Sequence, residues 1–128
     1  MKTQYTVVLA MFAGIAIGAT AIQALHAQGK PKAYSVSEIQ VLDQAALATY
    51  VPLVEPTIKA AGARNFNTGG GKITGFVGEP PKRVVIIEWD STEHAQAYVN
   101  SAAWKNLAPE RDKAQKITRS YVVEAVAN

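Results

Sequence analysis

The stretch RVVIIEW, from Arg83 to Trp89, contains four consecutive branched apolar residues, Val84 to Ile87. A continuous run of this kind is typical of a β-strand that is covered on both faces. A turn containing Pro80-Pro81 precedes the run, and Asp90-Ser91 follows it, so the strand is bounded at both ends. The run therefore predicts a central strand of a sheet with a covering layer on each face.

Two further strands are expected before this one. Residues 33–41 alternate between two faces, which predicts a first strand. The segments 64–68 and 73–77 both have extended character and flank Gly69-Gly70-Gly71. We interpret them as one long strand interrupted by a glycine bulge, because a hairpin would leave two very short arms.

A helix is expected between the first two strands, over residues 43–61. Apolar residues recur there with helical spacing and form one stripe: Leu47, Tyr50, Val51, Val54 and Ile58. Pro52 and Pro56 lie inside this stretch and lack a backbone N–H, so we expect the helix to kink or break. Gly62 is a candidate for the residue that ends it.

The second helical region follows the central strand and begins at Asp90 or Ser91, either of which can cap a helix. Its apolar stripe consists of Ala95, Tyr98, Val99 and Ala102. A further turn over 101–107 contains Trp104, a short last helix is expected over 110–115, and a final strand over 118–126.

The resulting order, β-α-β-β-α-β, predicts an α+β domain of the ferredoxin-like type. Right-handed crossovers place both helical regions on one face of a four-stranded antiparallel sheet. The other face still carries apolar residues and needs a cover. A second copy of the chain, packed face to face, is the simplest one, so we expect a homodimer.

The chain divides into a leader over 1–27, a short linker over 28–32 and the domain over 33–128. Lys2 is the only charge in the leader, and the 21 residues from Tyr5 to Leu25 have no charged side chain. This pattern predicts a signal peptide and a periplasmic or secreted domain. An uncleaved apolar helix that anchors the domain to the membrane is the alternative.

Composition narrows the classes of function. The chain has a formal net charge of +3 with scattered basic residues, which gives no sign of a nucleic-acid-binding surface. It has no cysteine, which excludes disulfides, thiol catalysis and thiolate zinc sites. His94 is the only histidine after the leader, so we predict no metal site.

A series of short pieces also occurs in a familiar order between Lys32 and Val126. They are Ala33-Tyr34, Asp43, Tyr50, Pro56, Gly62-Ala63-Arg64, Gly69-Gly70-Gly71-Lys72, Arg83-Val84-Val85-Ile86-Ile87-Glu88-Trp89, Ser91, Ser101-Ala102-Ala103-Trp104 and Arg111. The series resembles the domain of unknown function 1330 family. The resemblance implies a dimeric α/β barrel of two ferredoxin-like protomers, and no settled activity or cofactor. The chain departs from the family in its leader and in having only Trp104 where aromatic residues are usually more numerous.

Five charged or titratable residues are candidates for a site. Glu38 and His94 are candidate proton acceptors, and Glu88 is a second carboxylate on a largely apolar strand face. Arg64 and Arg111 could bind a ligand carboxylate, or pair with these acids to fix a strand to a helix. A solvated or capping role is the alternative for His94, and a strand-end position in water is the alternative for the two glutamates.

The aromatic residues form the remaining candidates. They suit a flat apolar ligand or, equally, an ordinary core: Tyr34, Tyr50, Tyr98, Trp89 and Trp104. The glycine run before Lys72 lacks the spacing of a phosphate-binding loop and is interpreted as a bulge.

Three functions remain open from the sequence. The first is an exported homodimer that binds a small apolar or aromatic ligand. The second is a cofactor-free enzyme of the monooxygenase or isomerase kind, with Glu38 or His94 as its base. The third is a structural dimer. A cavity would argue against the third, and a buried unpaired carboxylate beside it would favour the second.

Overall fold

The structure is a computed structural model, and it describes residues 30–126. The predicted leader lies outside the described residues. Between Lys30 and Val126, no helix is long and apolar enough to cross a membrane.

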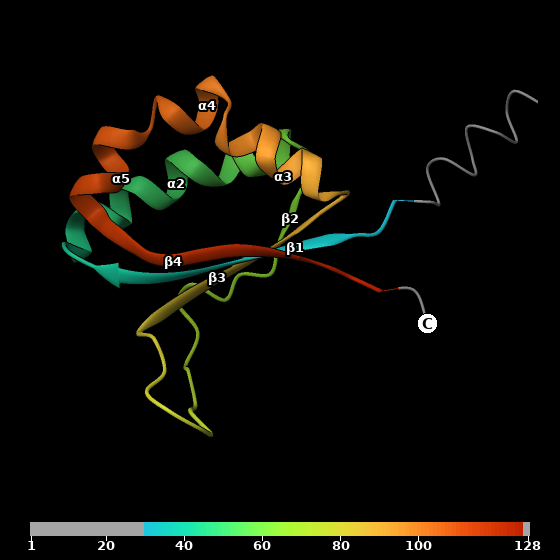
Figure 1. The fold of residues 1–128 in the computed structure, drawn as a ribbon. Coiled ribbons are helices and arrows are strands. Elements are labelled where there is room, and N and C mark those ends of the chain that lie inside the picture. The colour runs from blue at the N-terminus through green and yellow to red at the C-terminus, as the bar shows by residue number, and fades with distance from the viewer. Residues whose placement is uncertain (1–29, 127–128) are drawn as a thin grey trace, which may run out of the picture. The chain divides into compact units, whose positions relative to one another are not determined.

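One antiparallel sheet and one layer of helices make up the domain (Figure 1). The elements are β1 (Ala33–Val41), α2 (Gln44–Ala60), β2 (Arg64–Asn65), β3 (Arg83–Trp89), α3 (Thr92–Val99), α4 (Ala102–Lys105), α5 (Ala108–Ala114) and β4 (Gln115–Glu124). The strand order is β2-β3-β1-β4, which confirms the predicted ferredoxin-like α+β fold. β3 lies between two other strands, as its apolar run predicted.

Helix α2 is continuous, so the predicted break at its prolines is wrong. Asp43 caps its first turn by accepting a hydrogen bond from the Ala46 amide at 2.9 Å. Pro52 and Pro56 lie on the exposed side, where water can bind the carbonyl groups that the prolines leave free. Gly62, with a φ of 78°, ends the helix as predicted.

The segment between β2 and β3 also differs from the expectation of one long strand. Regular pairing stops at Asn65, and the backbone from residue 66 to 82 is irregular. Thr68 replaces part of the ladder, since its hydroxyl donates to the Val84 carbonyl (2.7 Å) and accepts from the Ile86 amide (3.2 Å). Glycines 69–71 and the two prolines then favour a loop over a strand. In Figure 1 this loop extends beyond the sheet, away from the helices.

The remaining boundaries follow from local chemistry. Ser91, which is 2% exposed, caps α3 by accepting from the His94 amide, whereas Asp90 pairs with Lys32 instead. The short helix α5 has Pro109 in its first turn, and β4 starts directly after it at Gln115, earlier than predicted.

The core lies between α2, α3 and the helix-side face of the sheet. Its buried members are Ala33, Leu47, Tyr50, Val54, Ile58, Ile87, Trp89, Ala95, Tyr98 and Ala114. Successive residues of a strand point to opposite faces of the sheet, so every second residue lies on the face away from the helices. Within residues 30–126, no helix covers that face. We call that side the open face.

Candidate functional site

A cavity of about 360 Å³ lies between α2 and the helix-side face of the sheet. All four strands, α2, α3, α4 and the first part of the 66–82 loop contribute to its walls. The lining residues are Ser37, Ile39, Tyr50, Val51, Val54, Glu55, Ile58, Asn65, Asn67, Gly69, Gly70, Arg83, Val85, Ile87, Tyr98, Trp104, Gln115 and Ile117. The cavity is partly open to solvent, and a concave region of this size with mostly apolar walls is typical of a small-molecule site.

Three aromatic side chains form one wall of the cavity. Tyr98 packs against Trp104 in a tilted arrangement with ring centroids 5.6 Å apart, and its hydroxyl lies 2.7 Å from the Thr57 hydroxyl. The Thr57 hydroxyl itself donates to the Val54 carbonyl, so Tyr98 is the donor of the pair. Burial raises the pKa of Tyr50 and of Tyr98 above the ordinary tyrosine value, so both phenols are neutral at physiological pH, as ordinary tyrosines are. The wall is therefore apolar with neutral hydroxyl groups.

Arg83, the first residue of β3, supplies the only cationic side chain among the lining residues. Its guanidinium donates to the Gly69 carbonyl at 2.5 Å. Its Nε is buried and has no hydrogen-bond partner within the described residues. Burial lowers the pKa of this guanidinium from its ordinary value. A positive group thus lies at one end of an otherwise mostly apolar cavity.

Arg111 lies behind the aromatic wall. It is 9% exposed, its guanidinium carbon lies 3.7 Å from the Trp104 ring centroid, and it donates to the Trp104 carbonyl at 3.0 Å. The alternative that Arg111 pairs with Glu38 or Glu88 is wrong, because stacking on Trp104 holds it on the helix side of the sheet. Arg111 therefore fixes the position of Trp104.

The open face carries a different set of residues, arranged in rows across the sheet. Cross-strand pairing aligns an apolar central row: Tyr121, Val36, Ile86 and Phe66. On one side of this row, Tyr34 lies between Val123 and Glu88, and its ring stacks on Phe66 with centroids 6.1 Å apart. Several of these side chains are strongly exposed, including Val123 at 52% and Tyr121 at 47%.

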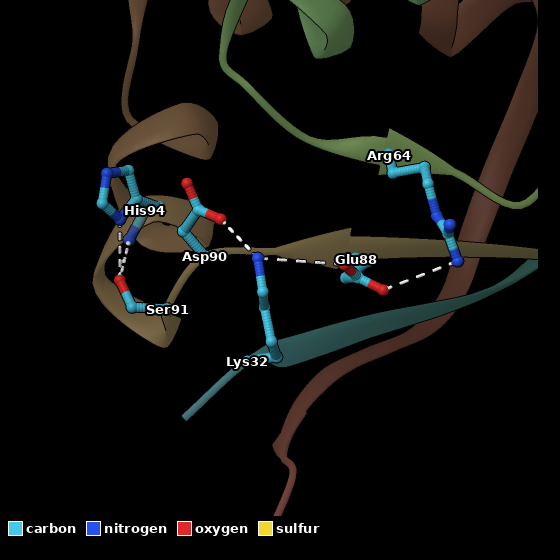
Figure 2. Close-up of polar contacts among 6 residues, drawn as sticks. All are labelled: Lys32, Arg64, Glu88, Asp90, Ser91 and His94. Atoms are coloured by element: carbon cyan, nitrogen blue, oxygen red, sulfur yellow. Dashed lines mark hydrogen bonds and ion pairs between the residues drawn. The ribbon is translucent and has the colours of Figure 1, made fainter. Parts of the chain in front are cut away.

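Ion pairs flank the apolar row. Glu88 lies 3.7 Å from Arg64 and 3.9 Å from Lys32, and Lys32 also binds Asp90 at 2.7 Å (Figure 2). On the other side of the row, Glu38 forms a salt bridge with Arg119, which raises the pKa of Arg119. Both glutamates thus have cationic partners. The pair of Arg64 with Glu88 agrees with the ion-pair alternative, whereas Arg119, the partner of Glu38, was not among the arginines considered.

His94 does not line the cavity, and it belongs to helix α3 and not to the open face of the sheet. It is exposed in the first turn of α3, and its Nδ1 is 2.7 Å from the Ser91 hydroxyl (Figure 2). This is the capping position that was the alternative to a catalytic role. No group of three or more acidic, histidine or cysteine side chains within residues 30–126 is arranged to hold a metal ion.

The predicted site residues therefore separate into distinct places. Tyr50 and Trp104 line the cavity, with Trp89 and Arg111 packed near them, whereas Tyr34, Glu38, Arg64 and Glu88 lie on the open face. Sequence reasoning missed Arg83 as a site residue. The alternation of residues along β3 could have shown on which face Arg83 lies, because it puts Arg83 on the same face of the sheet as Val85, Ile87 and Trp89.

Comparison with known proteins gives a family and a fold. A family model described as "Domain of unknown function (DUF1330)" matches residues 32–126. A search of curated proteins found no match. A protein of unknown function from Rhodopseudomonas palustris has a similar structure, with a TM-score of 0.60 and 13% identity over 77% of this chain and 85% of that chain.

A second similar structure is that of SnoaB, a cofactor-independent oxygenase from Streptomyces nogalater. Its TM-score is 0.56, with 9% identity over 77% of this chain and 96% of that chain. At these identities the likeness establishes the shared fold alone.

Proposed function

Since this chain belongs to the DUF1330 family over residues 32–126, and the family description assigns no activity, we propose a function from the cavity itself. The domain binds one small apolar or aromatic molecule per protomer, between α2 and the sheet. It works as a homodimer that is exported from the cytoplasm.

The cavity is the observation that supports ligand binding. Its volume of about 360 Å³ falls in the range of small-molecule sites, and aromatic and aliphatic side chains make up most of its walls. A purely structural dimer needs no such pocket, because apolar walls that stay in contact with water contribute less to stability than buried ones. The third hypothesis from the sequence is therefore disfavoured.

The open face supports the homodimer. Its central apolar row crosses β4, β1 and β3 and ends at Phe66, directly after β2, and the ion pairs of Glu38 and Glu88 lie on opposite sides of that row. A twofold axis through the row would place the same apolar residues of two protomers against each other. Such an arrangement removes a contiguous apolar surface from water, which is a strong driving force for association.

A cofactor-free enzyme, as SnoaB is described, is the second candidate. That function needs a base beside the substrate. Neither Glu38 nor His94 lines the cavity, and the one carboxylate that does, Glu55, is exposed on α2. The placement of these residues favours binding over base-catalysed chemistry.

Export is supported by the sequence of the leader, in which Lys2 precedes a long uncharged apolar run. The domain would then act in the periplasm or outside the cell, either free or held at the membrane by an uncleaved leader. Its ligand would be a molecule that occurs in that compartment.

Calorimetry with a neutral aromatic probe tests the binding proposal. We expect 2-naphthamide, a flat amide without charge, to bind the purified protein saturably with one molecule per chain. A dissociation constant in the micromolar to millimolar range is expected for a probe of this size, about −4 to −8 kcal/mol. A titration without saturable heat, confirmed by equilibrium dialysis, would contradict the proposal.

A further inference from the structure

We propose that the cavity is an anion site, and that its ligand is an apolar or aromatic carboxylic acid whose carboxylate binds Arg83. This inference rests on the proposed ligand-binding function and specifies the chemical class of the ligand.

The position of Arg83 follows from the register of the sheet. Arg83 pairs with Ile39 of β1, and both residues line the cavity. Alternation along β3 directs Arg83 to the same side as Val85 and Ile87, which are also cavity residues. The guanidinium therefore belongs to the cavity and not to the outer surface.

The hydrogen bonds of Arg83 are incomplete. Within residues 30–126, its side chain donates one hydrogen bond, to the Gly69 carbonyl, and no carboxylate lies within 4.0 Å of it. The buried Nε has no hydrogen-bond partner in the described part of the chain. A guanidinium has five N–H donors, so most of its capacity is unused by this part of the chain.

A partly buried cation without a counter-ion is costly, because it loses hydration that nothing replaces. A carboxylate is the group that compensates this loss best, since its two oxygens match the planar donors of a guanidinium. The only acid that lines the cavity, Glu55, is exposed on the other wall and forms no ion pair with Arg83. The missing negative charge is therefore expected from a ligand.

Gly69 gives a second indication that this end of the cavity is shaped around the guanidinium. A Cβ atom at position 69 would lie 2.6 Å from Nη2 and 2.9 Å from the central carbon of Arg83. Any side chain there would push the guanidinium away. The absence of a side chain thus lets the loop carbonyl hold Arg83 in place, while Asn65 and Asn67 form polar neighbours at the edge of the same cavity.

The rest of the cavity defines the remainder of the ligand. Beyond Arg83, the walls are mainly aliphatic, with the aromatic surface of Trp104 and Tyr98. A molecule with one carboxylate and a flat or branched apolar body matches this division. Highly charged molecules such as phosphate esters do not, because only one cation is available to them.

The test compares 2-naphthoate with 2-naphthamide, which have the same shape and differ in charge. We expect the wild-type protein to bind the acid about tenfold or more tightly than the amide. In Arg83→Met the preference should disappear: affinity for 2-naphthoate falls about tenfold or more, while affinity for 2-naphthamide changes less than about twofold.

Two further variants distinguish the effect of the Arg83 guanidinium in the cavity from the effect of the net charge of the protein. Lys82→Met removes one positive charge from the neighbouring exposed residue and should leave the preference for the acid intact. Gly69→Ala retains the charge and displaces the guanidinium, so it should reduce the preference even if Arg83→Met does not fold.

The outcomes distinguish this inference from the proposed function. Equal affinity of the wild-type protein for acid and amide would overturn the anion site and leave ligand binding in place. Binding of neither probe would overturn the proposed function itself. A preference for the acid that survives both Arg83→Met and Gly69→Ala would place the anion elsewhere and contradict the role of Arg83.

Discussion

Val123→Lys is expected to convert the dimer into monomers. Val123 is 52% exposed on the open face, where it pairs with Tyr34 beside the central apolar row. In the proposed dimer this position is buried, and an unpaired ammonium there costs about 2 kcal/mol or more. Twofold symmetry puts the substitution into the interface twice, so the dimer dissociation constant should rise by about a thousandfold.

Val99→Lys is the matched control for this experiment. Val99 has nearly the same exposure, 46%, but lies on helix α3, away from the open face. Analytical ultracentrifugation of both variants and the wild type measures the association directly. If wild-type protein is already monomeric at high micromolar concentration, or if both variants behave alike, the open face is not the dimer interface.

Val51→Trp is expected to abolish ligand binding without unfolding the protein. Val51 lies on α2, lines the cavity and packs against the core cluster. An indole group there would occupy space that the ligand needs. We expect affinity for 2-naphthamide to fall by about thirtyfold or more, while the added buried surface maintains or raises the melting temperature.

Leu53→Trp provides the comparison on the same helix. Residues 51 and 53 are about 200° apart around a helix axis, and Leu53 is 43% exposed and does not line the cavity. This variant should bind 2-naphthamide as the wild type does. If Val51→Trp retains normal affinity while its fold is intact, the probe binds somewhere other than this cavity.

The architecture was predictable because its signals are local and agree with each other. The apolar run of β3, the alternation in β1 and the helical stripe of α2 each point to one secondary structure, and their order leaves few topologies. The wrong predictions of secondary structure concern prolines and glycines, whose effect on a helix or strand depends on whether they face solvent and on the residues around them. The prolines of α2 did not break the helix because they lie on its solvent side, and the 66–82 segment became a loop where glycine and proline outweighed its apolar residues.

The site was less predictable, since it depends on which face of the sheet each residue occupies. Alternation placed Glu38 and Glu88 each on a mostly apolar face of its own strand, but that both lie on the same face of the sheet, and pair with Arg119 and Arg64, follows from the register. Arg83 was overlooked because it begins an apolar run and resembles an ordinary strand-end charge. Only the packing of α2 and the loop over the sheet shows that it lies against a cavity.

The central claim is that a small molecule binds between α2 and the sheet, and the two tryptophans of the chain test it most directly. Trp104 lines the cavity, whereas Trp89 donates its indole N–H to Ser35 and is not a lining residue. Each gives one indole N–H signal in a proton–nitrogen correlation spectrum. During titration with 2-naphthamide, we expect the Trp104 signal to shift saturably and the Trp89 signal to move much less. Saturable binding that leaves the Trp104 signal unchanged would contradict the account.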